Sequence, residues 1–271
     1  MNNSPAAVET KRGTGPIILG MPHTGLHVPP EITARLNEEG LALRDADWRV
    51  DELYDGLLAD ATIVRATFHR YVIDANRDPS GASLYPGQNT TGLIPIINFD
   101  GAPIWKTEPD DAEIERRRAE FHSVYHQALE TEIARIKEMH GAVILYDCHS
   151  IRSTIPHLFE GRLPDLNIGT NNGDTCADEI ENLVRNCAKA SDFSWVVNGR
   201  FKGGWTTRRY GRPHDGVHAI QMELAQSLYL ASEEPPFDYD AVRAEELRET
   251  LRTILQGLQE IAPSLTRGHA R

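Results

Sequence analysis

The chain is expected to adopt an α/β fold with a mixed, largely parallel sheet that is flanked by helices. Two observations predict it. Short apolar runs such as 16–21, 142–147 and 217–224 have the composition of buried strands. Between them lie long segments whose apolar residues recur every three or four positions, as on the buried face of a helix. Strands that alternate with helices favour a parallel or mixed sheet.

The elements follow in order along the chain. The run "PIILGM" (16–21) predicts a first strand, and it leads into "PHTG", a turn built on Pro22 and Gly25. The run "RYVIDANRDP" (70–79) predicts a second strand that ends in polar residues. From 110 to 140 the apolar side chains follow one helical face, and Gly141 ends that helix.

The C-terminal half continues the alternation. "AVILYD" (142–147) and "VHAIQMEL" (217–224) predict two further strands, and the apolar stripe of 240–261 predicts a final helix. We expect one catalytic domain over 15–264, since a chain of 271 residues that is 40% hydrophobic can bury a substantial single core. Residues 1–14 and 265–271 are small and polar, and are expected to form a flexible lead-in and a flexible tail.

Charge and composition exclude several classes of partner. The formal net charge of −12 disfavours nucleic acids and anionic membrane surfaces, because both would be repelled by the average field of the protein. No apolar stretch is long enough to span a membrane or act as a signal peptide. The three cysteines form no CxxC pair, so we expect a protein of the reducing cytoplasm. The sequence leaves the oligomeric state open.

Polar side chains stand at four predicted strand ends. They are His23, the pair Asn76 and Arg77, His149, and Glu223. Open α/β sheets bind their ligands at the carboxyl ends of the strands, so these side chains are expected to converge. Two imidazoles with a carboxylate are the ligands of a catalytic zinc, which keeps a fourth position for water. The sequence therefore predicts a metal site with His23 and His149 as ligands.

The third ligand is sought in "DADWRVDELYD" (45–55). Asp47 and Asp51 are four residues apart and would share one face of a helix. The alternative interpretation is that these carboxylates form a solvent-exposed acidic face of a helix and bind no metal. Because apolar residues in this segment point to partial burial, the acidic row is expected to need a cation. Asp51 is our choice for the ligand, with Asp47 as its supporting partner or the reverse.

Several motifs together resemble one known family. They are "PHTG", "DWRVDELYD", "RYVIDANRDP", "ASLYPGQNTTGL", "YDCHSIRS", "LPDLNIGTNNG", "GRFKGGWTTRRYGRP" and "GVHAIQMELAQ". In this order, from about residue 16 to about 260, they look like the N-formylglutamate amidohydrolase (N-formylglutamate deformylase) family. The resemblance implies a zinc-dependent hydrolase that releases formate from N-formyl-L-glutamate in histidine degradation, with one Zn²⁺ per chain. It also implies a fold similar to the zinc carboxypeptidases and aspartoacylases (phosphorylase/hydrolase-like).

The resemblance carries roles over by position. His23 and His149 match the metal histidines, and Glu223 stands where the related peptidases keep their catalytic glutamate. Asn76 and Arg77 resemble the pair with which those peptidases grip a substrate carboxylate. In the peptidases the acidic ligand lies three residues after the first histidine, but that position here is Leu26. The acid must therefore come from elsewhere in the chain.

A substrate with two carboxylates needs a local cluster of cations even in an acidic protein. Arginine suits a planar, bidentate grip on a carboxylate. Arg77 and Arg208 are the favoured residues, followed by Arg152. The alternatives are hydrolysis of another N-acyl or N-formyl amino acid, or a non-catalytic dicarboxylate-binding protein.

Two further constellations receive structural interpretations. His122 and His126 are four apart on the long helix, but "HSVYH" lacks the glutamate of HExxH, so we expect them at a helix edge. Cys148 precedes His149, and neighbours on a strand point to opposite faces. A Cys–His dyad is therefore not expected.

Overall fold

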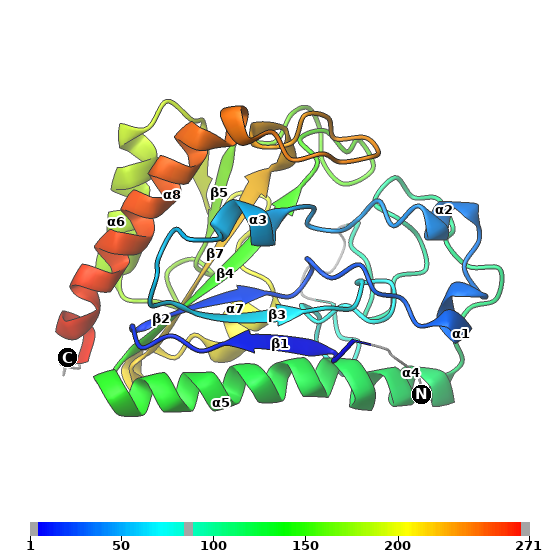
Figure 1. The fold of residues 1–271 in the computed structure, drawn as a ribbon, viewed down its shortest axis with the longest axis horizontal. Coiled ribbons are helices and arrows are strands. Elements are labelled where there is room, and N and C mark those ends of the chain that lie inside the picture. Colours follow the sequence, from blue (N-terminus) through cyan, green and yellow to red (C-terminus); the bar gives the residue numbers. More distant parts are fainter. Residues whose placement is uncertain (1–4, 84–88, 267–271) are drawn as a thin grey trace.

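The computed structural model describes residues 5–83 and 89–266, and the described strands form one sheet in the order β1-β3-β2-β4-β7-β5-β6 (Figure 1). The strands are β1 (Val8–Lys11), β2 (Ile17–Met21), β3 (Thr62–Ala66), β4 (Val143–Ile151), β5 (Leu166–Gly169), β6 (Trp195–Val197) and β7 (Val217–Ala225). The central strands β3, β2, β4 and β7 run parallel. β1 pairs antiparallel with β3, and β5 pairs antiparallel with β7 but parallel with β6. The expected mixed, largely parallel sheet is confirmed.

Helices cover both faces of the sheet. They are α1 (Pro30–Thr33), α2 (Glu38–Leu41), α3 (Val50–Tyr54), α4 (Asp111–Arg117), α5 (Ser123–His140), α6 (Asp178–Ala190), α7 (Trp205–Tyr210) and α8 (Ala241–Ile261). A π-helical turn, Arg118–His122, joins α4 to α5, and 3₁₀ turns lie at Pro213–Asp215, Gln226–Leu228 and Ala262–Thr266. In Figure 1, α4 and α5 run along one face, and α6 and α8 lie on the other.

The core explains why the central strands read as continuous apolar runs. Along β4, Val143 and Leu145 pack in the cluster that includes α5, whereas Ile144 and Tyr146 pack in the cluster that includes α6 and α8. Successive side chains of a strand point to opposite faces, so a strand covered on both faces must be apolar at every position. The predicted strands at 16–21, 142–147 and 217–224 and the helices at 110–140 and 240–261 are confirmed by this arrangement.

Two expectations about the N-terminal half are wrong. Residues 70–79 form no strand, because several of their carbonyls accept hydrogen bonds from helix side chains; the carbonyl of Val72, for example, accepts from Arg117 at 3.1 Å. The strand at this place in the sheet is β3 instead. Part of the expected lead-in, residues 8–11, is strand β1, which pairs with β3.

The remaining expectations about the ends concern few described residues. Residues 1–4 and 267–271 lie outside the described part of the chain, as do residues 84–88 of the motif "ASLYPGQNTTGL". Residues 262–266 extend α8 as a 3₁₀ turn. No helix within 5–83 and 89–266 combines the length and the apolar character that crossing a membrane requires.

Candidate active site

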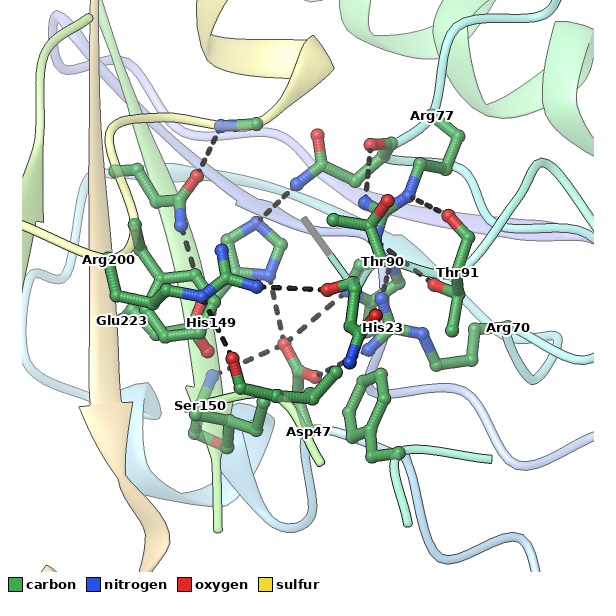
Figure 2. Close-up of a pocket in the computed structure, with 18 residues that line it drawn as sticks. His23, Asp47, Arg70, Arg77, Thr90, Thr91, His149, Ser150, Arg200 and Glu223 are labelled. Carbon is green, nitrogen blue, oxygen red and sulfur yellow. Dashed lines mark hydrogen bonds and ion pairs between the residues drawn. The ribbon is translucent and has the colours of Figure 1, made fainter. Parts of the chain in front are cut away.

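A pocket opens at the carboxyl ends of the central strands (Figure 2). His23 follows β2, His149 lies near the end of β4, and Glu223 lies near the end of β7. His149 and Glu223 are directly paired in register on the adjacent parallel strands β4 and β7. Three of the four predicted strand ends, those of His23, His149 and Glu223, converge, because parallel strands place their carboxyl ends at one edge of a sheet. Asn76 and Arg77 reach the same pocket from a segment that is not a strand.

Two histidines and one aspartate in this pocket are grouped closely enough to hold a metal ion. His23, Asp47 and His149 are all buried, and one ligand atom from each lies within 4.8 Å of the others. Asp47 Oδ2 lies 3.0 Å from His149 Nδ1 and 3.7 Å from His23 Nδ1. Both rings therefore present Nδ1 to the same carboxylate oxygen.

Two other buried carboxylates lie beside the opposite ring nitrogens, and that of Asp74 is hydrogen-bonded to His23. His23 Nε2 lies 2.7 Å from Asp74 Oδ1, and His149 Nε2 lies 3.2 Å from Asp147 Oδ1. Histidines that bind metals usually donate their second N–H to a carboxylate or carbonyl, which fixes the ring and leaves the first nitrogen for the metal. The donor set and its supporting carboxylates thus fit a divalent ion of the zinc type.

The structure replaces Asp51 with Asp47 in this group. Asp51 lies outside the pocket, where its Oδ2 is 2.8 Å from Nη1 of Arg65 and its side chain is 40% exposed. The assumption of one continuous helix was wrong, because Arg49 adopts the left-handed conformation (φ 60°) and α3 begins only at Val50. Asp47 therefore lies before the helix and Asp51 within it, and the two carboxylates point to different places.

The charged groups of this cluster shift one another's pKa values. Burial alone would raise the pKa of Asp47, but the His23 and His149 imidazoles hold it below its usual range. Burial would lower the pKa of His149, but Asp147 and Asp47 raise it well above its ordinary value. In the metal-free site the carboxylates and the imidazoles therefore stabilise each other's charged forms.

Glu223 has the protonation behaviour of a group that exchanges protons near neutral pH. It is buried, and its Oε2 accepts a hydrogen bond from Gln221 Nε2 at 3.2 Å. Burial raises its pKa to about 8, with His149 opposing the shift and Asp47 adding to it. General acid–base groups work best with a pKa near the operating pH.

Three arginines line the pocket: Arg70, Arg77 and Arg200. The guanidinium of Arg77 is held by Thr91, whose carbonyl accepts from Nε at 2.9 Å and whose hydroxyl accepts from Nη2 at 3.1 Å. Arg200 Nη2 donates to the carbonyl of Asn89 at 3.0 Å. In Figure 2, Arg77 and Arg200 approach from different sides of the two labelled histidines. An anion in this pocket would be met by positive charge on more than one side.

Arg70 is the most deeply buried of these cations. Its Nη2 lies 2.7 Å from Asp74 Oδ2, and its Nη1 donates to the carbonyl of Asp45 at 3.2 Å. Its Nε is buried and has no hydrogen-bond partner within the described residues. Arg70 therefore forms an ion pair with Asp74, the carboxylate that is hydrogen-bonded to His23. Its Nε–H remains as a donor that no described residue accepts from.

The other expected substrate contacts differ in their placement. Asn76 lines the pocket as expected, with its side-chain amide 3.1 Å from His149 Nε2. Arg152 and Arg208 are not among the lining residues: Arg152 pairs with Asp100 at 2.8 Å, and Arg208 Nε donates to the carbonyl of Gly203 at 2.9 Å. Neither arginine lines the pocket in this structure, and their contact with substrate stays a prediction.

Several functional candidates were missed although signals for them were present. Arg70 and Asp74 belong to the motif "RYVIDANRDP", and Arg200 belongs to "GRFKGGWTTRRYGRP", the motif that also contains Arg208. Asp147 lies two residues before His149 on β4 and so shares its face. The same alternation places Cys148 in the core cluster with α6 and α8, as expected when the Cys–His dyad was rejected.

An α/β fold with buried acid–base groups, a candidate metal centre and a cationic pocket is the arrangement of a hydrolytic enzyme that acts on an anionic substrate. Residues 15–230 match the model of the N-formylglutamate amidohydrolase family, and the chain belongs to that family. It is 44% identical to the N-formylglutamate deformylase of Pseudomonas aeruginosa over 252 residues, 92% of this chain and 94% of that protein. It is 43% identical to the N-formylglutamate deformylase of Pseudomonas putida over 251 residues, 91% of this chain and 93% of that protein.

Solved structures agree with this assignment. The crystal structure of N-formylglutamate amidohydrolase from Ralstonia eutropha JMP134 superposes with a TM-score of 0.77 at 26% identity, covering 97% of this chain and 100% of that one. A gene product from Agrobacterium tumefaciens, Atu2144, superposes with a TM-score of 0.71 at 20% identity, covering 95% and 96%. The second comparison supports the fold alone.

Proposed function

We propose that the protein hydrolyses N-formyl-L-glutamate to formate and L-glutamate with one zinc ion per chain, as a step of histidine degradation. The observation that carries the proposal is the grouping of His23, Asp47 and His149 beside Glu223 in a pocket lined by arginines. The names of the Pseudomonas relatives support the substrate. The cytoplasmic location and the likeness to the zinc carboxypeptidase and aspartoacylase fold stay predictions.

His23, Asp47 and His149 would hold the metal, with Asp74 and Asp147 orienting the rings. When bound, zinc supplies a Lewis acid and lowers the pKa of water at the site. Both histidines must be neutral to bind a metal ion, so metal affinity should fall as the pH is lowered.

Glu223 moves the proton during hydrolysis. It accepts a proton as the water oxygen bonds to the formyl carbon, and it delivers that proton to the glutamate nitrogen as the carbon–nitrogen bond breaks. Its hydrogen bond from Gln221 holds the carboxyl group in the pocket. Burial raises the pKa of Glu223 to about 8 in the metal-free fold and so favours the protonated carboxyl that delivers the proton in the second step.

Arg70 is the arginine best placed to stabilise the negative charge that develops on the formyl oxygen. It is 6% exposed, lines the pocket, and has a buried Nε without a partner in the described residues. A preorganised donor in a water-poor site stabilises a developing oxyanion more than it stabilises the neutral carbonyl.

Arg77 and Arg200 are proposed to bind the two carboxylates of the substrate. Both line the pocket and reach it from different chain segments. Phe99, Leu158 and Phe201 also line it and offer apolar surface for the methylene groups between the two charges. A pocket of this kind selects a short dicarboxylate over a neutral acyl amino acid.

The deciding experiment is release of formate from N-formyl-L-glutamate by the purified protein. We expect release that a chelator abolishes and that added Zn²⁺ restores, with N-formylglutamate and N-formylaspartate as better substrates than N-formylalanine. Full activity after verified removal of the metal would overturn the metal-dependent mechanism. No formate from any of these compounds would overturn the proposed reaction.

A further inference from the structure

Two buried histidines outside the catalytic group lie directly beneath the segment that carries Asn76 and Arg77. His122 is 2% exposed and His126 is 6% exposed. The expectation that they stand at a helix edge is wrong, because segment 75–77 covers them. The function described above uses neither residue.

Both histidines bond the backbone on either side of Asn76. His122 Nε2 lies 2.9 Å from the carbonyl oxygen of Arg77, and His126 Nε2 lies 2.8 Å from the carbonyl oxygen of Ala75. A carbonyl oxygen only accepts, so each Nε2 carries the proton and donates it. Burial lowers the pKa of both rings, that of His126 to about 3, so both are neutral at physiological pH.

A second brace reaches the same segment from α7. The Trp205 ring centroid lies 5.4 Å from that of His122 and 4.6 Å from that of His126. The next residue along the chain, Thr206, donates its backbone N–H to Asn76 Oδ1 at 2.8 Å. The histidine rings and the start of α7 therefore both contact segment 75–77, which forms one wall of the pocket.

The helix is deformed at the point where this contact begins. In the π turn Arg118–His122 the spacing widens, so Arg117 and His122, five residues apart, both reach the buried side. Arg117 donates to the carbonyl of Val72 at 3.1 Å, so side chains of this helix satisfy carbonyls along an irregular buried segment. π turns within α-helices are frequent at functional sites.

We propose that His122 and His126 are positioning residues for the reaction: their N–H donors hold the backbone that carries Asn76 and Arg77. Through Asn76 they act on His149, since the Asn76 amide lies 3.1 Å from His149 Nε2. Through Arg77 they set the position of a proposed carboxylate clamp. The kinetic part of this inference rests on the proposed deformylase function.

The test compares variants that lose the donor with variants that keep one. His122→Leu and His126→Leu remove the N–H, whereas His122→Gln and His126→Gln retain a side-chain N–H of similar reach. Ile136→Ala is the matched control, because Ile136 is fully buried on the same helix about 15 Å further along. The readouts are kcat and KM for N-formylglutamate, and hydrogen–deuterium exchange of the Asn76 and Arg77 amides.

We expect His122→Leu to raise KM by about tenfold or more with kcat within about threefold of the parent, because it loosens the Arg77 side of the segment. His126→Leu should also lower kcat, because Ala75 precedes the residue that contacts His149. Amide exchange at 76–77 should rise about tenfold in both leucine variants and return toward the parent value in the glutamine variants. Ile136→Ala should destabilise the fold without changing this exchange or KM.

Parental KM and parental exchange in both leucine variants would overturn the proposal. Equal changes in Ile136→Ala, or no recovery in the glutamine variants, would reduce the histidines to packing residues and overturn it as well. If His126→Leu does not fold, His122→Leu and His126→Gln carry the comparison. If the parent releases no formate, the deformylase function fails while the exchange measurement still decides the positioning role.

Discussion

Replacing Glu223 with glutamine is the sharpest test of the proposed chemistry. The glutamine side chain keeps the size of Glu223 and can still accept the hydrogen bond from Gln221, but it cannot take a proton from water. We expect kcat to fall by about 10²- to 10⁴-fold, the range typical of lost general acid–base assistance. Zinc content and substrate affinity should stay near the parental values, because the metal-binding group and the arginines are unchanged.

The same change has a stability consequence whose sign follows from burial. Burial raises the pKa of Glu223 from 4.5 to about 8 in the metal-free fold. The penalty for burying the carboxylate is absent below pH 4.5 and grows as the pH rises toward 8, since only the unfolded chain ionises freely. At pH 7 the penalty is about 3 kcal/mol, at about 1.4 kcal/mol for each pH unit above 4.5. Glu223→Gln should therefore stabilise the metal-free protein by up to about 3 kcal/mol at pH 7, and hardly at all at pH 4.5.

Three measurements on one variant check this reasoning. Formate release reports kcat, metal analysis reports zinc content, and urea unfolding in the presence of a chelator reports stability at pH 4.5 and pH 7. A kcat within about fivefold of the parent would mean that another group takes the proton from water. A variant less stable than the parent at pH 7 would refute the unfavourable burial of the Glu223 carboxylate.

Further predictions concern the metal, the substrate and acid stability. Asp47→Ala should lose metal and activity, whereas Asp51→Ala, four residues away, should keep both within about twofold; metal analysis and formate release distinguish the two, and the reverse pattern would restore Asp51 as ligand. Arg200→Ala should raise KM for N-formylglutamate. In the parent enzyme N-formylalanine should lose roughly 2–5 kcal/mol of transition-state binding, because it lacks the second carboxylate that the clamp would bind; equal kcat/KM for both compounds would refute a clamp on the side-chain carboxylate. Burial lowers the pKa of His69 to about 3 and that of His218 to about 4, so both stay neutral in the fold and gain protons on unfolding below pH 6.5. Each histidine should lower the free energy of unfolding by about 1.4 kcal/mol for every pH unit from 6.5 down to its folded pKa. The variant His218→Gln should therefore show a weaker pH dependence of the free energy of unfolding. Urea unfolding at pH 7, 6 and 5 measures this dependence.

Local sequence was sufficient for the fold class and for His23, His149 and Glu223, three of the four residues of the proposed metal and acid–base group, but not for Asp47. Strands β2, β4 and β7 and helices α5 and α8 were predicted because strand and helix periodicities are properties of neighbouring residues. His23, His149 and Glu223 each follow or end an apolar run, and the rule that ligands bind at the carboxyl ends of parallel strands brought them together. The resemblance to the family named the chemistry that these residues serve.

The choice between Asp47 and Asp51 needed the tertiary structure. Both are acidic, both lie in the same motif, and a helical pattern places them on one face. The left-handed conformation of Arg49 separates them, and the carboxylate of Asp51 is drawn away to Arg65 on β3. The residue spacing within 45–55 predicts neither the conformation of Arg49 nor the ion pair of Asp51, because both depend on residues from other parts of the chain.

Segment 70–79 shows the same limit on a larger scale. Its apolar residues predicted a strand, yet its backbone is satisfied by side chains of a helix more than forty residues further along the chain, such as Arg117 at the carbonyl of Val72. Whether a buried carbonyl meets a neighbouring strand or a distant side chain is decided only when the chain has folded. For the same reason the supporting carboxylate Asp74 and the pocket arginine Arg200 become recognisable from the partners that the fold brings to them, rather than from their neighbours in the sequence.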